Sequence, residues 1–183
     1  TIERLAFGGE GVGRADGKVV FVPLTAPGDQ VRVRITAHHA RYDRGVVEEV
    51  VQPSPHRATP RCSVFGRCGG CHWQHLGYPA QIQAKEEILK DTLARVGRIS
   101  EVKVLPMIPA SEPWNYRNRI QLHVDERGEI GFFASGSHEV VPFDRCEIAD
   151  ERLSEWVQSA RGNGKIPTSR FEIAVDAEGC VST

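Results

Sequence analysis

The sequence of 183 residues lacks any apolar run of about 18 residues or more, so nothing in it is suited to cross a membrane. Its first residues lack the basic start and apolar stretch of a secretory signal, and they lack an initiating Met. Charge of one sign is not in excess either, because 23 Lys and Arg stand against 24 Asp and Glu. We find no repeats and no low-complexity tract. These absences exclude a membrane-spanning protein, favour a cytoplasmic globular chain, and are consistent with the removal of upstream sequence.

A net charge of −1 by itself argues against a nucleic-acid-binding protein, but the basic residues are clustered. Residues 32–44 hold four arginines and two histidines against one acid, Asp43. Residues 116–123 contain Arg117 and Arg119 and no acid. Two interpretations remain open for both segments: solvated surface charge, or a path for RNA phosphates.

The first 53 residues are predicted to be all-β. Residues 30–36 alternate apolar and polar side chains, and short apolar runs at 19–23 and 44–51 are typical of further strands. About five short strands in this length suggest a small OB-like barrel. The glycine-rich stretch at 8–13 has no helix after it, so it favours a bent strand or bulge over a phosphate-binding loop. Three prolines within residues 53–60 mark a boundary, which gives predicted domains at 1–53 and 54–183.

In the second predicted domain, a cysteine-rich stretch is followed by a helix over residues 79–97, which begins at Pro79 and ends at Gly97. Its apolar residues fall on one stripe that we expect to be buried: Ile82, Leu89, Leu93 and Val96. Four strands of an antiparallel sheet are expected at 101–106, 116–125, 129–134 and 138–143. A second helix starts near Asp150, and a last hairpin from residue 170 stops as if it had been cut. The expected fold class is therefore mainly β with a few helices (α+β).

Three of the five cysteines, Cys62, Cys68 and Cys71, form the pattern C-x5-C-x2-C. A cytosolic chain keeps its thiols reduced, and the cysteine count is odd, so metal ligands are favoured over disulfides. Gly69 and Gly70 between the last two cysteines permit positive φ and a close approach of the backbone to inorganic sulfur. Their N–H groups are then candidates for donors to the ligand sulfurs.

Three interpretations of the thiols remain open: unrelated buried cysteines, a structural zinc site, and an iron–sulfur cluster. Zinc knuckles usually pair two C-x2-C units, and the second unit is missing here. An iron–sulfur cluster accepts three local cysteines and one remote cysteine, for which Cys146 and Cys180 are the candidates. The spacing differs from the C-x3-C-x2-C of radical enzymes. With four thiolates every iron has a protein ligand, so the cluster would be a structural or RNA-contacting element.

Three segments are informative together: "DGKVVFVPLTAPGDQVRVRI", "PSPHRATPRCSVFGRCGGCHWQHLGYPAQIQAKEEIL" and "WNYRNRIQLHV". They resemble the RNA uracil-C5 methyltransferases, and more closely the branch that modifies 23S ribosomal RNA. The resemblance covers essentially the whole chain. It implies a TRAM domain, which is an OB-like RNA-binding module, followed by a central domain with a [4Fe-4S] cluster. The implied ligands are Cys62, Cys68 and Cys71 with one distal cysteine, which we assign to Cys146 from its position after the sheet.

The resemblance also implies a C-terminal Rossmann-like domain that binds S-adenosylmethionine and carries the catalytic groups. No glycine-rich strand-to-helix turn follows Cys146, so we expect that domain to be absent. The chain would then be the RNA-recognition portion of a 23S rRNA methyltransferase, not catalytically competent by itself, and monomeric. The alternative is a free-standing RNA-binding module with a structural iron–sulfur or zinc site.

Seven residues are candidates for RNA contacts. Cationic side chains suited to phosphates are Arg41, Arg44, Arg117 and Arg119, and aromatic rings suited to bases are Tyr42, Trp73 and His75. For Trp73 the alternative is core packing against the helix near Ile82. For His75 the alternative is a hydrogen bond that holds the cysteine loop.

Overall fold

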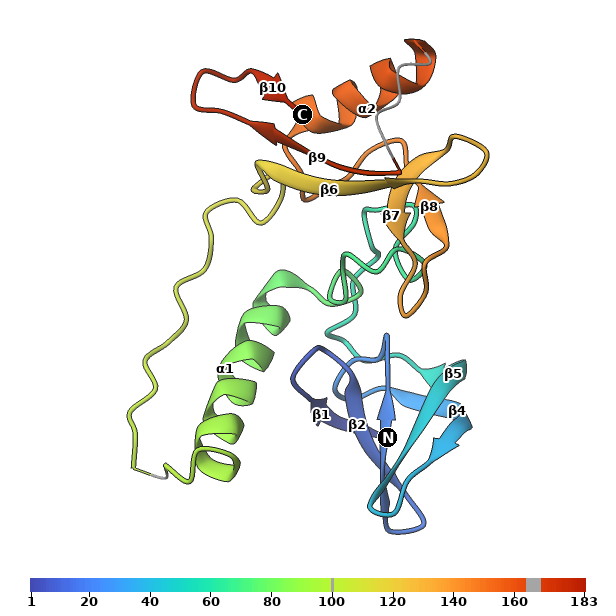
Figure 1. Ribbon diagram of the computed structural model, residues 1–183. Helices are drawn as coiled ribbons and strands as arrows, with labels where there is room; N and C mark the ends of the chain where they lie inside the picture. Colours follow the sequence, from blue (N-terminus) through green and yellow to red (C-terminus); the bar gives the residue numbers. More distant parts are fainter. Residues whose placement is uncertain (100, 164–168) are drawn as a thin grey trace. The chain divides into compact units, whose positions relative to one another are not determined.

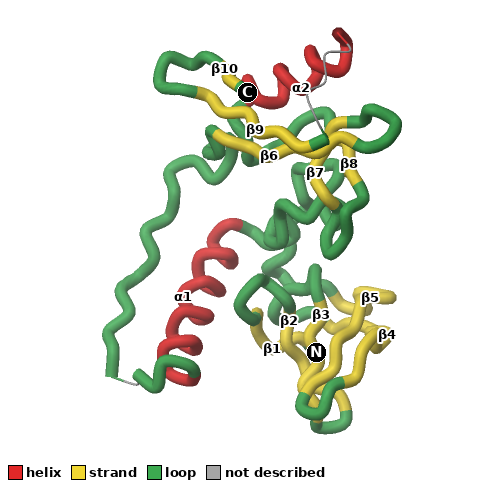
Figure 2. The backbone as a smooth tube through the Cα atoms, in the orientation of Figure 1, coloured by secondary structure: helices red, strands yellow, loops and turns green. Residues whose placement is uncertain are grey.

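The computed structural model describes residues 1–99, 101–163 and 169–183 (Figure 1). They form two compact units, each of which is described by itself. The first combines Thr1–Pro60 with His72–Pro109, and the second combines Arg61–Cys71 with Ala110–Thr183. Each unit therefore draws on two separated stretches of chain, which the sequence patterns did not predict. The regular structure of the described residues is mainly β, with two helices (Figure 2).

A five-stranded sheet makes up most of the first unit. Its strands are β1 (Ile2–Leu5), β2 (Gly11–Ala15), β3 (Lys18–Val22), β4 (Gln30–His38) and β5 (Tyr42–Gln52). The strand order is β1-β2-β3-β5-β4, and β3 runs parallel to β5 while the other pairs are antiparallel. This arrangement is that of a five-stranded, partly open OB-like barrel.

The alternating side chains of the strands account for the core of this barrel. Ile2, Val20 and Val22 are buried at its centre, and the apolar face of β4 packs against them through Val31 and Val33. The turn between β2 and β3 has positive φ at both central residues, Asp16 and Gly17. That geometry is the type I′ hairpin turn that Asp-Gly favours, since its twist matches that of the strands.

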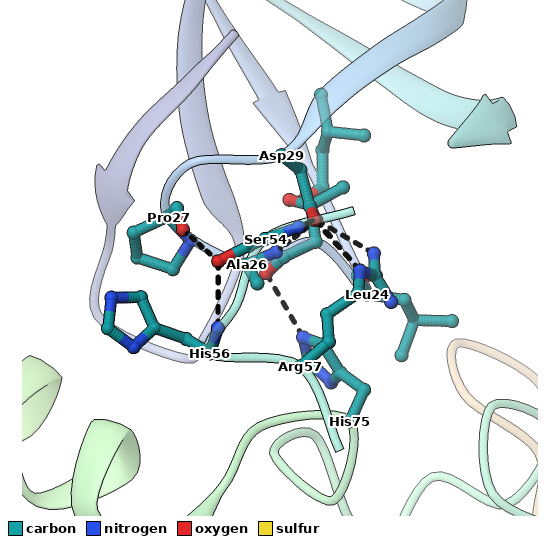
Figure 3. A network of polar contacts seen from close by, with 10 residues as sticks. Leu24, Ala26, Pro27, Asp29, Ser54, His56, Arg57 and His75 are labelled. Carbon is teal, nitrogen blue, oxygen red and sulfur yellow. Dashed lines mark hydrogen bonds and ion pairs between the residues drawn. The ribbon is translucent and has the colours of Figure 1, made fainter. Parts of the chain in front are cut away.

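A buried carboxylate ties the proline-rich segment after β5 to the barrel (Figure 3). Asp29 is fully buried, and its oxygens accept hydrogen bonds from the backbone N–H groups of Ala26 at 2.6 Å and Ser54 at 2.8 Å. The Arg57 guanidinium donates to the same carboxylate through Nε at 2.9 Å and Nη2 at 2.8 Å. Burial alone would raise the pKa of Asp29, but these donors together hold it below its ordinary value.

Helix α1 (Tyr78–Arg95) follows in the first unit. Pro79 stands in its first turn as predicted, and the Gly97 N–H donates to the Thr92 carbonyl at its end. The prediction of a buried stripe is wrong, because Leu89 is 44% exposed and Val96 is 77% exposed. The helix buries Ala84 instead, which packs with a small cluster of apolar residues: Leu5, Ala26 and Leu76. A small buried residue lets the helix lie close to the barrel, and the larger residues fall beside that contact.

The second unit contains a five-stranded antiparallel sheet. Its strands are β6 (Arg119–Val124), β7 (Ile130–Phe133), β8 (Val140–Pro142), β9 (Arg170–Val175) and β10 (Val181–Ser182). The order is β10-β9-β6-β7-β8. The predicted turn between β6 and β7 is present: the Asp125 carboxylate accepts the N–H groups of Arg127 and Glu129, and Gly128 takes a φ of 83°.

Helix α2 (Glu151–Asn163) covers one face of this sheet. Asp150 caps its start, since the Asp150 carboxylate accepts the N–H of Arg152 at 3.1 Å. Leu153 and Val157 of the helix pack with Leu122 and Ile173 of the sheet, and all four are fully buried. The alternating side chains of β6 and β9 therefore divide into a core face under α2 and an opposite face, which we call the outer face.

One further prediction about the second domain is wrong. Residues 101–106 form no strand, because their apolar side chains lie outside any core: Val102 is 46% exposed and Leu105 is 67% exposed. In the last hairpin, Val181 of β10 lies opposite Val175 on β9. Among the described residues, neither helix is both long and apolar enough to span a bilayer.

Candidate functional site

The cysteine loop of the second unit is a series of tight turns. The N–H of Phe65 donates to the Cys62 carbonyl at 3.2 Å, and the N–H of Cys68 donates to the Val64 carbonyl at 3.0 Å. Gly66 takes a φ of 87°, which few residues other than glycine adopt readily. The turns fold the chain back within six residues, so Cys62 and Cys68 return to the same region.

Backbone hydrogen bonds anchor this loop to the second sheet. The Gly69 N–H donates to the Phe133 carbonyl at 2.9 Å, and the Ser135 N–H donates to the Arg67 carbonyl at 3.1 Å. A Cβ on Gly69 would lie 3.1 Å from the Phe133 oxygen, which is tighter than an ordinary contact. The Gly-Gly pair thus gives a close approach of two backbones. Gly69 and Gly70 do not adopt the positive φ that glycine permits, and Gly66 supplies that conformation in the loop.

Cys146 lies between β8 and α2 in the same unit. Its backbone N–H donates to the Ser154 hydroxyl at 3.1 Å, which fixes it against the first turns of the helix. Burial raises the pKa of the Cys146 thiol, and the N–H groups of Ile148 and Ala149 act in the opposite direction by favouring the thiolate. Such amide donors at a helix start are suited to stabilise sulfur that carries negative charge.

The structure brings the three loop cysteines and Cys146 close enough together for the charge of one thiolate to affect the pKa of another. Burial raises the pKa of Cys68, and the charges of Cys71 and Cys62 raise it further. The same two residues raise the pKa of Cys146. The Gly70 N–H donates to the Cys68 sulfur at 3.4 Å. All four cysteines are half-buried and outside any disulfide, so together they form a thiol cluster, the donor set that soft metals prefer.

Cys180, the fifth thiol, is exposed in the turn between β9 and β10. Its backbone N–H donates to the Asp176 carboxylate at 2.7 Å. Across residues 1–99, 101–163 and 169–183, no three His, Cys, Asp or Glu side chains are arranged so that they hold a single metal ion.

In the first unit, an aromatic and basic patch lies on the barrel around the start of β5. The Tyr42 ring stacks on His39 with centroids 4.4 Å apart and meets Phe21 edge-on at 5.4 Å. Arg44 lies over the Phe21 ring, and its guanidinium pairs with Glu10 at 2.5 Å. The exposed Arg41 is the residue before Tyr42. Sequence reasoning missed the rings of Phe21 and His39. The parallel pairing of β3 with β5 brings Phe21 beside Tyr42, and the turn between β4 and β5, in which the His39 N–H donates to the Tyr42 carbonyl, brings His39 there.

The two aromatic residues after the cysteine loop belong to the interior of the first unit. Trp73 packs against the cluster that includes Leu76, and Lys85 lies over its ring. His75 is only 3% exposed, with Nε2 3.0 Å from the Thr25 carbonyl oxygen. Burial lowers the pKa of His75, which favours the neutral ring. The packing of Trp73 is of the kind that the sequence left open, whereas the contact of His75 is with the barrel residue Thr25.

The two arginines of the second unit differ in their surroundings. Arg117 is exposed. Burial raises the pKa of Cys68, and the positive charge of Arg117 acts in the opposite direction, so Arg117 lies near the thiol cluster. Arg119 starts β6 and pairs with Glu172 on β9 at 3.4 Å, with both side chains more than half exposed. Close to the loop, the Arg61 guanidinium lies 4.9 Å from the centre of the Trp114 ring. Cationic and aromatic groups are thus present in both units.

Comparison with known proteins places these features in context. Residues 1–47 match the TRAM domain family. The chain is 43% identical to an RNA methyltransferase of Thermosynechococcus vestitus, over 84% of this chain and 35% of that protein. It is 40% identical to an RNA methyltransferase of Bdellovibrio bacteriovorus, over 99% of this chain and 47% of that protein. The chain therefore spans about a third to a half of the length of these relatives.

A solved structure matches nearly the whole chain. It is the Pyrococcus abyssi tRNA (uracil-54, C5)-methyltransferase in complex with S-adenosyl-L-homocysteine, which is 26% identical with a TM-score of 0.71. The match covers 98% of this chain and 43% of that one. Together with the relatives, this similarity supports a relationship to the RNA uracil methyltransferases.

The same match overturns one expectation about the fold. The sequence led us to describe the chain as a fragment from which the methyltransferase domain is absent. That description is wrong, because this mainly β chain with two helices matches a methyltransferase structure over 98% of its length. The expectation was based on the absence of a glycine-rich turn, and that turn is only one of the local motifs by which proteins hold a cofactor.

Proposed function

We propose that this chain recognises RNA as part of an S-adenosylmethionine-dependent RNA (uracil-C5)-methyltransferase. The observation that carries the proposal is the OB-like barrel, which matches the TRAM family, within a chain that resembles a tRNA (uracil-54, C5)-methyltransferase along 98% of its length. S-adenosylmethionine as methyl donor is supported by the S-adenosyl-L-homocysteine in that structure. We further propose a cytoplasmic, monomeric protein that modifies 23S ribosomal RNA, on the resemblance of the cysteine-rich segment to that branch.

The barrel patch around Tyr42 is the proposed first contact with RNA. Its rings offer stacking surfaces for unpaired bases, and Arg41 and Arg44 offer charges for phosphates. In OB-folds the loop between strands 4 and 5 is one of the usual oligonucleotide contacts, and His39 and Arg41 occupy that loop here. Arg117 and Arg119 are proposed phosphate contacts of the second unit.

For the thiol cluster we propose a [4Fe-4S] centre held by Cys62, Cys68, Cys71 and Cys146. Four thiols from two separated segments provide the donor set, and the N–H groups of Gly70 and Ala149 supply hydrogen bonds that favour sulfur with negative charge. Such a centre would cross-link the cysteine loop to the start of α2. A structural zinc ion is the alternative occupant.

The methyltransferase activity is tested with the full-length protein and radiolabelled S-adenosylmethionine. Transcripts of tRNA and of 23S rRNA are offered separately, and mass spectrometry locates any 5-methyluridine. Methylation of the rRNA alone supports the proposed substrate, and methylation of the tRNA alone would contradict it while keeping the enzyme class. Failure of both, with folded protein, would contradict the proposed function.

The RNA contact of the barrel is tested with Arg41→Ala/Arg44→Ala. We expect weaker binding to many RNAs and a shallower dependence of affinity on salt, because each phosphate contact releases counterions. The matched control is Arg32→Ala/Arg34→Ala on β4, which removes the same charge from side chains paired with Glu49 and Glu48. An equal effect of both pairs would show that only the overall charge matters.

The metal centre is tested by anaerobic purification and analysis. A [4Fe-4S] centre gives about four irons and four acid-labile sulfides per chain. Stoichiometric zinc without labile sulfide would replace the iron–sulfur proposal by the zinc alternative.

A further inference from the structure

Three aromatic rings meet on the outer face of the second sheet, the face that α2 does not cover. The His123 ring of β6 stacks on the Phe133 ring of β7, with centroids 3.5 Å apart and planes 17° from parallel. His138, in the loop after β7, meets Phe133 edge-on at 5.0 Å. Burial and the nearby Arg170 and His138 lower the pKa of His123, so this ring is neutral at neutral pH and stacks as an uncharged aromatic.

Cationic side chains stand on the strands around this stack. Arg170 of β9 lies directly across from His123 in the sheet register, and Arg119 begins the same strand as His123. Glu172 pairs with Arg119 at 3.4 Å, and both side chains are more than half exposed, so solvent screens that pair. The face therefore combines flat aromatic rings with positive charge and hydrogen-bonding groups.

The stack is also held rigidly from behind. The Phe133 carbonyl accepts a hydrogen bond from the Gly69 N–H of the cysteine loop. The Ser135 N–H donates to the Arg67 carbonyl, which also ties this segment to the loop. On the opposite side of β7, Phe132 stacks on the core residue Phe143 at 4.7 Å. A strand fixed on both sides presents its rings with little conformational entropy left to lose, which favours binding.

We propose that this outer face is a second RNA-binding surface, on which unpaired bases extend the stack of His123 and Phe133 while Arg119 and Arg170 contact phosphates. Aromatic rings beside cations on a sheet are the chemistry by which proteins hold single-stranded RNA. The inference rests on the proposed RNA recognition and adds a surface separate from the barrel patch. Stacking is tolerant of sequence because every base has a π-face.

The test uses the full-length protein, purified anaerobically, and a fluorescent single-stranded oligouridylate of about 12 nucleotides, a length within the range of known single-strand sites. Phe133→Leu keeps an apolar side chain and removes the ring, and His123→Ala removes the other half of the stack. The matched control is Phe132→Leu, the same substitution one residue away on the core face. Anisotropy across a salt series gives affinity, and circular dichroism checks the fold.

We expect Phe133→Leu and His123→Ala each to weaken binding about fivefold or more, which is the effect of losing one stacked base. The salt dependence should stay unchanged, because no cation is removed. Phe132→Leu should bind RNA like the wild type although it lowers stability. RNA carrying 4-thiouridine should cross-link, in the wild-type protein, to the peptides that contain His123 and Phe133.

Wild-type affinity in folded His123→Ala, together with cross-links that map only outside this face, would overturn the proposal. The cross-linking decides the question even if Phe133→Leu does not fold, since it uses the unaltered protein. Should the barrel variant Arg41→Ala/Arg44→Ala lose affinity while the stack variants do not, the outer-face surface is refuted and the proposed function stands. Absence of any RNA binding by the wild type would refute both.

Discussion

Replacing Asp29 by Asn leaves the Arg57 guanidinium opposite a neutral amide in the interior of the first unit. Removing one partner of a buried ion pair typically costs about 3–5 kcal/mol, because the remaining charge is desolvated without compensation. Asp29 is fully buried, whereas the Arg57 side chain is 24% exposed, so water relieves part of the penalty on the arginine. We therefore expect a loss near the lower end, about 3 kcal/mol.

Hydrogen exchange measured by mass spectrometry gives the opening free energy of the barrel strands β4 and β5. The control is Glu49→Gln, the same change in the exposed pair with Arg32, in which the side chains are 52% and 66% exposed. That variant should lose less than about 1 kcal/mol. Should Asp29→Asn lose no more than Glu49→Gln, the buried network does not stabilise the barrel as we argue.

Two companion measurements probe the charge itself. Adding Arg57→Met to Asp29→Asn should recover part of the lost stability, because the uncompensated charge is then gone. The pKa of Asp29 lies below its ordinary value of 3.8, so the stabilisation by its carboxylate is complete above that pH. This stabilisation should be lost as the pH falls below 3.8 and passes through the lower pKa of Asp29 in the folded state. The stability difference between wild type and Asp29→Asn should therefore be constant at neutral pH and shrink below about pH 4.

Two more predictions concern the second unit. In iron analysis, Cys146→Ser should lose the proposed metal centre or leave it labile. Cys180→Ser changes an exposed thiol in the last hairpin and should retain the centre. The reverse pattern would overturn the ligand assignment. Gly131→Ala should destabilise the sheet by about 1–3 kcal/mol in denaturant unfolding, because its Cβ would clash with the Val141 carbonyl oxygen. Gly162→Ala meets no atom within 4 Å and should change stability little or raise it; equal effects of the two changes would contradict the packing argument.

Much of the local structure follows from the sequence. The alternation of residues 30–36 predicts the strand that became β4, and Asp125 to Gly128 predicts the turn of the β6–β7 hairpin. The spacing of Cys62, Cys68 and Cys71 predicts a loop with three thiols in one place. These signals are reliable because side-chain periodicity, turn conformation and short loops depend on residues close together in the chain.

Local patterns were misleading wherever the outcome depended on a distant partner. The stripe on α1 has helical periodicity, yet Leu89 and Val96 remain exposed, because only Ala84 reaches the barrel. Residues 101–106 have the composition of a strand but no neighbouring strand to pair with. Periodicity states which side chains share a face, and it does not state whether another element covers that face.

The sequence by itself determined most of the strands, both helices and the spacing of the three local cysteines, since each depends on residues close together in the chain. The tertiary structure alone decided which remote residues join them. It brought Cys146 into range of the loop thiols, set Arg57 against Asp29 across 28 positions of sequence, and stacked His123 on Phe133. The reason is physical: these contacts depend on sheet order, on strand register and on which face a helix covers, and a shift of one residue in any register would separate them.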